Sequence, residues 1–210
     1  MATPTGPARI DRAARADHPM RWQLRDLVLV IVLGVVFGFV YWVLVQAWNA
    51  LAVAMGPMGD LAQHVLQGGW LIVAPVAVAL TRRAFSGVLA EVLAAVTEFV
   101  FLGSPVGPLL AVSGILQGGG SELPFALGRY RRFGWARYAL SGFLGALFVF
   151  FWSAFRFGWY GTDLFWIRLV VHCASGVIIG GLLAKLLVDA IERTGVADSF
   201  ASGRARRGRG

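Results

Sequence analysis

The chain has 210 residues, of which 58% are hydrophobic and only 14% are charged, and its mean hydropathy is +0.70. A soluble domain carries about a quarter charged residues and cannot keep so much apolar surface away from water. The net charge of +8 belongs to tails and short segments between apolar blocks rather than to a folded basic domain, so composition excludes a soluble enzyme and a nucleic-acid-binding protein.

A helix that crosses a bilayer needs roughly 20 apolar residues, and six apolar blocks of this chain are candidates. In chain order they are Leu27–Val45, Gly68–Leu80, Ala84–Leu102, Gly107–Leu127, Ala136–Phe155 and Leu164–Ala190. The second block is short and contains Pro75, so it needs His64–Gln67 to complete a span. The first block has too long an apolar run for a cleaved signal peptide, and a polar tail precedes it.

We therefore predict an all-α fold, an integral membrane bundle of six transmembrane helices over residues 26–193. A basic tail (1–25) precedes it and a Gly/Arg tail (194–210) follows it, and both tails are expected to be disordered. The tail at 203–210 is also expected to attract the anionic headgroups of the lipid bilayer.

Basic residues occupy alternate loops. They are Arg9, Arg12, Arg15, Arg21 and Arg25 before the first block, Arg82 and Arg83 after the second, Arg129, Arg131, Arg132 and Arg137 around the gap between the fourth and fifth, and Lys185, Arg193, Arg204, Arg206, Arg207 and Arg209 at the end. The opposite loops, residues 47–67, 103–106 and 156–163, contain one arginine, Arg156, and no lysine. The positive-inside rule then predicts an even number of spans in the cell membrane, with both termini cytoplasmic.

Aromatic residues gather near the predicted outer ends of the helices. The outer group is Trp42, Trp48, Trp70, Trp152, Trp159, Tyr160 and Trp166, against Trp22, Tyr130 and Trp135 on the inner side. An interfacial belt places aromatic residues on both sides, and this distribution is lopsided. Some outer tryptophans are therefore expected to line a pocket that opens outward.

Two carboxylates lie within the third apolar block. Glu91 and Glu98 are seven residues apart and share one helix face, and a carboxylate in hydrocarbon is a functional hypothesis by default. The alternative is an internal hydrogen bond or ion pair that holds helices together. The short loop 103–106 makes the third and fourth helices an antiparallel hairpin, which places Glu98 level with Ser113 and Glu91 near the depth of Gln117. This pairing predicts a polar niche that is open to the outside and suits a cationic or hydrogen-bond-donating ligand.

Further binding candidates are found near the outer ends of other helices. Any one of these aromatic residues is commonly a belt residue, but as a set beside two carboxylates they resemble the stacking walls of a heteroaromatic or cation site. They are Tyr41, Trp48, Asn49, Trp70 and Trp166.

The remaining polar residues have structural interpretations. Glu122 is expected to pair with the Arg129–Arg132 cluster. Arg168 is expected to pair with Glu98 or Asp163, or to extend to the interface. His172 is interpreted as a hydrogen-bonding residue of helix packing, with a role in the ligand site or as a catalytic base as the alternatives.

Glycines at four-residue spacing allow helices to approach closely. Gly34 and Gly38 have this spacing on the first helix, and Gly176 and Gly180 have it on the sixth. The two interpretations are packing within the bundle and docking against another membrane subunit. The single cysteine, Cys173, excludes an intramolecular disulfide and a cysteine-rich metal site, and we predict no metal site and no cofactor.

One enzyme class competes with a transport role. Rhomboid-type intramembrane serine proteases also have six spans, with a serine on the fourth and a histidine on the sixth, where this chain has Ser113 and His172. The segment Ala111–Gly114 lacks the leading glycine of that serine motif, and the second span lacks the residues that would stabilise an oxyanion. A self-powered transporter is not expected either, because the chain shows no internal repeat and no nucleotide-binding motif.

A set of motifs resembles one known family. The motifs are Trp22–Asp26, Gly34-x-x-x-Gly38 followed by Tyr41, Trp48–Asn49, Gly69–Trp70, Glu91-x6-Glu98 and Gln117-Gly-Gly-Gly-Ser-Glu122 followed by Phe125 and Tyr130. Together they resemble the YkoE-type S component of energy-coupling factor (ECF) vitamin transporters, over the range from Arg21 to Ala190.

The resemblance implies a membrane subunit that binds thiamine or its hydroxymethylpyrimidine precursor. Such a subunit works with a transmembrane coupling subunit and cytosolic ATPase subunits, and does not itself hydrolyse ATP. In the family a small-x-x-x-small motif on the first helix meets the coupling subunit, and Gly34 and Gly38 stand there. Glu98 or Glu91 would balance the thiazolium charge or accept hydrogen bonds from the amino group, and Gln117 would read the pyrimidine edge. Which glutamate takes which role stays open.

Overall fold

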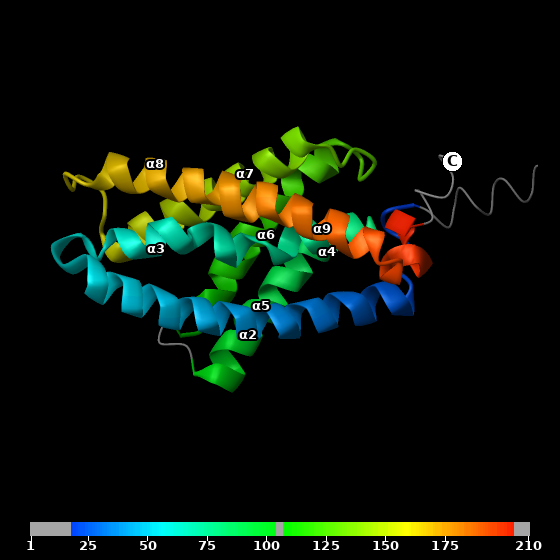
Figure 1. Ribbon diagram of the computed structural model, residues 1–210, viewed down its shortest axis with the longest axis horizontal. Helices are drawn as coiled ribbons and strands as arrows, with labels where there is room; N and C mark the ends of the chain where they lie inside the picture. Colours follow the sequence, from blue (N-terminus) through cyan, green and yellow to red (C-terminus); the bar gives the residue numbers. More distant parts are fainter. Residues whose placement is uncertain (1–17, 104–106, 204–210) are drawn as a thin grey trace, which may run out of the picture.

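A computed structural model of the chain describes residues 18–103 and 107–203 (Figure 1). All regular elements in these ranges are helical, as predicted. They are α2 (Leu24–Met55), η1 (Gly56–Met58), α3 (Leu61–Leu66), η2 (Gln67–Leu71), α4 (Val73–Thr81), α5 (Ser86–Leu102), α6 (Leu110–Leu127), α7 (Trp135–Phe157), α8 (Phe165–Ser175), η3 (Gly176–Leu183), α9 (Ala184–Arg193) and η4 (Val196–Ser199). η3 is a π-helical stretch, and the other η segments are 3-10 turns.

Four helical segments in the described ranges are long and apolar enough to cross a membrane. They are Leu24–Met58, Leu61–Thr81, Trp135–Phe157 and Phe165–Arg193. The second includes His64–Gln67, so the expected extension of the short apolar block is confirmed. α5 has only 17 residues, and α6 has 18 residues that include several polar ones. The count of six spans therefore stays a prediction, although α5 packs between α2 and α6, and α6 packs on α7.

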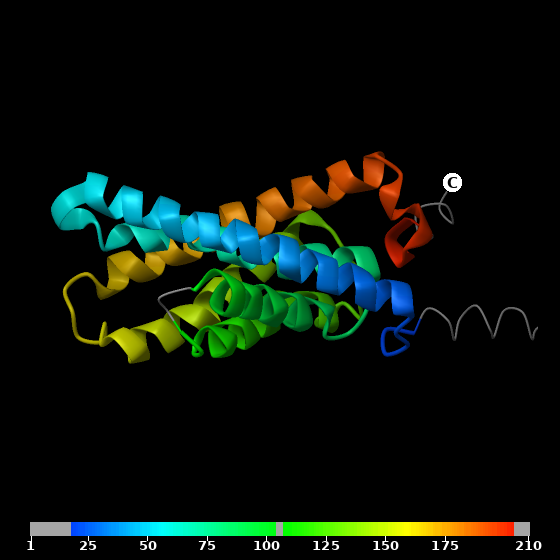
Figure 2. The same cartoon turned by 90° about the horizontal axis from the view of Figure 1, so that it is seen from below.

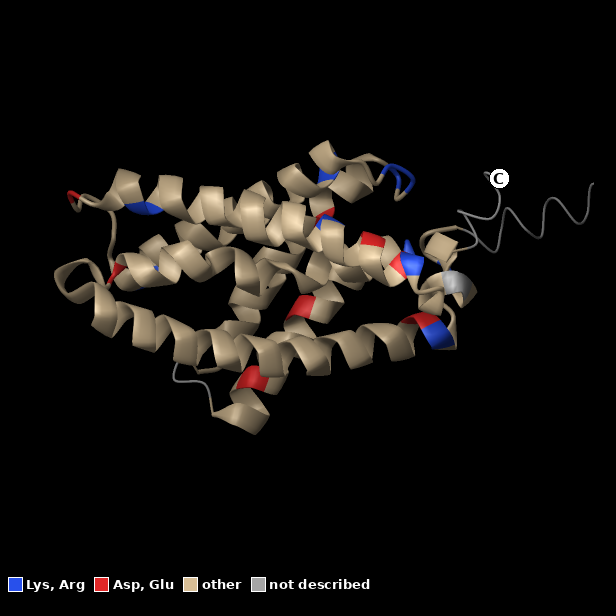
Figure 3. Ribbon diagram, in the orientation of Figure 1, with Lys and Arg blue, Asp and Glu red and all other residues tan. Residues whose placement is uncertain are grey.

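Both ends of the described chain lie at the same end of the elongated bundle (Figures 1 and 2). Figure 3 shows most of the basic residues at this end, near the start of α2, near the end of α9 and in the turn between α6 and α7. This is the end that the positive-inside rule assigns to the cytoplasm. The structure contains no membrane, so the orientation stays a prediction.

Gly34 and Gly38 bring α2 close to α5. A Cβ atom added at Gly34 would lie 2.5 Å from the Cβ of Leu93, and one at Gly38 would lie 2.5 Å from the Cβ of Thr97. Such distances are too short for packed side chains, so only glycine allows this approach. The packing interpretation accounts for both residues, and the surface that they were expected to offer to a coupling subunit is covered by α5.

A second close contact joins η2 to the sixth helical segment. A Cβ atom added at Gly180 would lie 2.8 Å from the Cβ of Leu71, and one at Gly68 would overlap the backbone oxygen of Ser175. The glycines of the sixth segment thus also serve packing within the bundle. The contact fixes the position of η2, which contributes to the candidate site.

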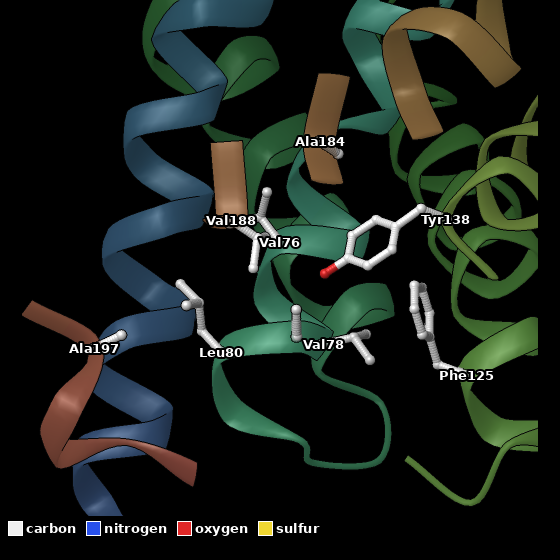
Figure 4. Close-up of a cluster of buried hydrophobic side chains, with 9 residues drawn as sticks. Val76, Val78, Leu80, Phe125, Tyr138, Ala184, Val188 and Ala197 are labelled. Carbon is white, nitrogen blue, oxygen red and sulfur yellow. The ribbon is translucent and has the colours of Figure 1, made fainter. Parts of the chain in front are cut away.

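A cluster of buried apolar side chains lies toward the end of the bundle where both ends of the described chain lie (Figure 4). It combines residues of α4, α6, α7 and α9, including Val76, Phe125, Tyr138 and Val188, with Ala197 of η4. Ala197 is 2% exposed, so ordered structure extends beyond the predicted boundary of the membrane domain at residue 193. A buried ion pair, Arg83 Nε to Asp26 Oδ2 at 2.7 Å, ties the start of α2 to the turn after α4.

The predicted pairing of Glu122 with the arginine cluster is wrong. Its carboxylate instead accepts hydrogen bonds from the backbone N–H groups of Phe85, Gly87 and Val88 at 2.5–3.1 Å, and from the Tyr130 hydroxyl at 2.7 Å. These N–H groups belong to the start of α5, where a helix lacks its own acceptors and its dipole favours negative charge. Arg129 lies in an exposed turn with φ of 52°, and its expected structural role is not observed.

Candidate functional site

A cavity lies toward the end of the bundle opposite to the two ends of the described chain. Its walls come from the second half of α2, from α3 and η2, from the second half of α5, from the first half of α6 and from the end of α7. The residues that define its chemistry are Trp48, Gln63, Gln67, Trp70, Glu98, Ser113, Gln117, Ser153 and Arg156. The polar niche expected between the third and fourth helices therefore exists, and it is wider than predicted because η2 and α7 complete it.

Five of the ten predicted binding residues meet in this cavity, namely Trp48, Trp70, Glu98, Ser113 and Gln117. The spacing of Ser113 and Gln117 puts both on one face of α6, and the hairpin brings Glu98 of α5 to the same depth. Glu98 is 1% exposed and Trp70 is 8% exposed. The cavity thus combines a buried carboxylate with amide groups and two indole rings.

Glu91 is buried outside the cavity. The Tyr41 hydroxyl donates a hydrogen bond to its Oε2 at 3.0 Å, and the backbone N–H of Ala74 donates to its Oε1 at 3.4 Å. These contacts join α2, α4 and α5. The interpretation of Glu91 and Tyr41 as ligand contacts is therefore replaced by the alternative, a hydrogen bond that holds helices together.

Three other predicted residues also lie outside the cavity lining. Asn49 is exposed, and Trp166 is 71% exposed, beside Phe165 at the start of α8. His172 is buried, and its Nδ1 lies 2.9 Å from Nδ1 of His64, so one ring donates and the other accepts. The helix-packing interpretation of His172 agrees with this geometry.

The serine protease alternative has no support in the described ranges. The Ser113 hydroxyl donates to the backbone oxygen of Leu109 at 3.5 Å, whereas the hydrogen-bonding partner of His172 is His64. A nucleophile and its base must lie within hydrogen-bonding reach of each other, and no such contact between Ser113 and His172 is observed.

The comparisons with known proteins all indicate a membrane transport protein. Residues 25–148 match a family model described as "ABC-type cobalt transport system, permease component". The chain is 31% identical over 185 residues to the "Putative HMP/thiamine permease protein YkoE" of Bacillus subtilis (strain 168), covering 87% of this chain and 91% of that protein. It also matches a solved structure, "Crystal structure of an S-component of ECF transporter", with a TM-score of 0.82, 30% identity and coverage of 90% and 95% of the two chains. The chain is a YkoE-type S component of an ECF transporter. The resemblance seen in the sequence motifs is thus confirmed.

The cavity of this S component also contains four polar residues that the sequence did not single out as binding residues. Gln67 was used only in tracing the second span, Gln63 was not considered, and Ser153 and Arg156 come from α7. Their spacings, four and three residues, place each pair on one helix face. This spacing was the available signal, but it does not say which neighbouring helix the face meets.

Arg168 makes contacts other than the predicted ones. In this S component, Nε of Arg168 donates to Oδ2 of Asp60 at 2.6 Å, and its Nη1 donates to the Thr162 hydroxyl at 2.7 Å. The predicted partners, Glu98 and Asp163, were therefore wrong. The contact joins the start of α3 to the turn before α8, at the end of the bundle away from the described chain ends (Figure 1).

Proposed function

We propose that this S component captures thiamine, or its hydroxymethylpyrimidine precursor, from outside the cell. A separate transmembrane coupling subunit and cytosolic ATPase subunits then drive uptake, and the S component itself hydrolyses no ATP. The observation that carries the proposal is the cavity in which the buried carboxylate of Glu98 lies with Gln117 and the indoles of Trp48 and Trp70.

The chemistry of these side chains fits the ligand class. Thiamine contains a cationic thiazolium ring and a flat aminopyrimidine ring. A buried carboxylate either balances the cation or accepts hydrogen bonds from the amino group, and in both roles the interaction is strong because water is excluded. Indole faces attract cations and stack on heteroaromatic rings. The amide of Gln117 offers a donor and an acceptor to a pyrimidine edge.

The names of the relatives support a transport role and differ about the cargo. The curated relative is a putative HMP/thiamine permease, and the family model refers to cobalt. Within residues 18–103 and 107–203, no group of three or more His, Cys, Asp or Glu residues is placed to hold a metal ion. The amides and indoles of the cavity favour the organic ligand.

The proposed direction of binding follows from charge. The cavity lies at the end opposite to the basic turns and the termini, and the positive-inside rule places those in the cytoplasm. The cavity then faces the outside of the cell membrane, where a vitamin arrives.

Isothermal titration calorimetry on the purified full-length protein tests the proposal. Thiamine and hydroxymethylpyrimidine should release or absorb heat with a saturating 1:1 isotherm, whereas riboflavin and biotin should not. Absence of binding to both pyrimidine compounds would refute the substrate class, and preferential binding of Co²⁺ would support the cargo named by the family model.

A further inference from the structure

Gln67 combines burial, a place in the cavity wall and a hydrogen-bond donor without an acceptor. Its side chain lines the cavity and the residue is 4% exposed. Among the residues that the structure describes, none forms a hydrogen bond with its Nε2. A buried donor without a partner is costly, so a group that enters the cavity and accepts from this amide gains the full value of the hydrogen bond.

The position of Gln67 is fixed by its neighbours. The next residue, Gly68, donates its backbone N–H to the Ser175 hydroxyl at 2.9 Å, and this hydroxyl donates to the backbone oxygen of Val65 at 2.6 Å. The close approach of Gly68 to the sixth segment leaves no room for a side chain there. Hydrogen bonds to Ser175 therefore fix the backbone at Val65 and at Gly68, before and after Gln67 in the sequence, in the absence of a ligand. This lowers the entropic cost of binding.

Trp70 lies three residues after Gln67 on the same 3-10 turn. Side chains at this spacing eclipse each other in a 3-10 helix, and both residues line the cavity. One turn of backbone thus brings an indole and an amide donor to the same cavity wall. This combination suits a flat heteroaromatic ring, which presents a face for stacking and a ring nitrogen as an acceptor at its edge.

We propose that Gln67 determines specificity by donating a hydrogen bond from Nε2 to a ring nitrogen of the aminopyrimidine, while Trp70 stacks on the ring. This inference rests on the proposed function. It adds a requirement that charge recognition by Glu98 does not impose: the ligand ring must have an acceptor nitrogen. A ring of the same shape with C–H in that place leaves the donor unpaired, and sites built on such hydrogen bonds reject the analogue strongly.

The test compares hydroxymethylpyrimidine with its two monodeaza analogues, in which one or the other ring nitrogen is replaced by C–H. Calorimetry on the full-length protein should show that one analogue binds about tenfold or more weakly than the parent compound. Gln67→Met keeps the length of the side chain and removes the donor, so it should bind the parent compound and that analogue within about twofold of each other. Gln67→Leu is a second variant for the same comparison if the Met variant does not fold.

Gln46→Met is the matched control. Gln46 is exposed on α2 and does not belong to the cavity lining, so the same change there should leave the discrimination between the ligands as in the wild type. Equal binding of all three compounds by the wild type, or full discrimination in a folded Gln67→Met protein, would overturn the role of Gln67 alone. A wild type that binds none of the compounds would overturn the proposed function, and the role of Gln67 with it.

Discussion

Glu91 and Glu98 lie two turns apart on one face of α5, about 10 Å along the helix axis, and their surroundings differ. Glu91 accepts hydrogen bonds from Tyr41 of α2 and Ala74 of α4, where these two helices pack on α5. Glu98 lines the cavity between α5, α6 and η2. The sequence spacing makes the two carboxylates equivalent, and only the packing of the other helices separates a structural residue from a candidate ligand contact.

Glu98→Gln should weaken thiamine binding by more than tenfold, because it removes the negative charge from the cavity wall and keeps the shape of the side chain. Glu91→Gln is the matched control. Its amide oxygen can still accept from Tyr41, so affinity should stay within about threefold of the wild type. Calorimetry on the two purified variants measures both values. Equal effects of the two changes would contradict the assignment.

Tyr41→Phe should reduce stability without changing affinity. The change deletes the hydroxyl that donates to Glu91 at 3.0 Å and leaves a buried acceptor without this partner, at a cost of about 1–3 kcal/mol. The measurement is the thermal unfolding midpoint in detergent, together with a thiamine titration. A loss of affinity with an unchanged midpoint would assign Tyr41 to the ligand site instead.

At the level of the elements, close contact between helices depends on particular glycines. Gly38 of α2 faces Thr97 of α5, where a Cβ atom would lie 2.5 Å from the Cβ of Thr97. Gly119 of α6 has the same helical backbone, but a Cβ atom added there would meet no neighbouring atom within 4 Å. The two glycines therefore allow a direct comparison of packing with intrinsic helix propensity.

Gly38→Ala should destabilise the protein by about 1–3 kcal/mol, because α2 must move away from α5 to accommodate the methyl group. Gly119→Ala should be neutral or stabilising by up to about 1 kcal/mol, because alanine favours the helix and meets no neighbour. Thermal or denaturant unfolding of both variants in the same detergent decides between these outcomes. Similar midpoints for the two variants would mean that the α2–α5 contact is looser than the structure shows.

The elements were predicted better than the contacts between them. Apolar block length was enough to indicate an all-helical fold and to locate the second span despite Pro75. Glu122 was assigned wrongly because its nearest opposite charges along the chain are arginines, whereas the partners that it finds are backbone N–H groups of a helix that begins 36 residues earlier, at Ser86. Glu98, Ser113 and Gln117 were found because α5 and α6 are adjacent in sequence and form a hairpin, and Trp48 and Trp70 were found because tryptophans gather near the predicted outer ends. Gln67 and Arg156 were missed because the spacing of polar residues on a helix does not say which neighbouring helix that face meets.

On the scale of the whole molecule, the charge distribution predicts a sidedness that can be measured. In a Cys173→Ala background, Gly161→Cys places a thiol in the turn before α8, and Arg131→Cys places one in the turn between α6 and α7. A membrane-impermeant thiol reagent applied to intact cells should label the variant at position 161 and should label that at position 131 only after permeabilisation. The opposite pattern would reverse the proposed orientation and turn the cavity toward the cytoplasm.

The elements that line the cavity meet toward one end of the bundle, and both ends of the described chain lie at the other (Figures 1 and 2). Affinity tags, fluorescent proteins or surface linkers can therefore be attached at either end without obstructing the mouth of the cavity. A protein immobilised through its C-terminus would present that mouth to the flowing solution, which suits this S component to a surface-based vitamin sensor.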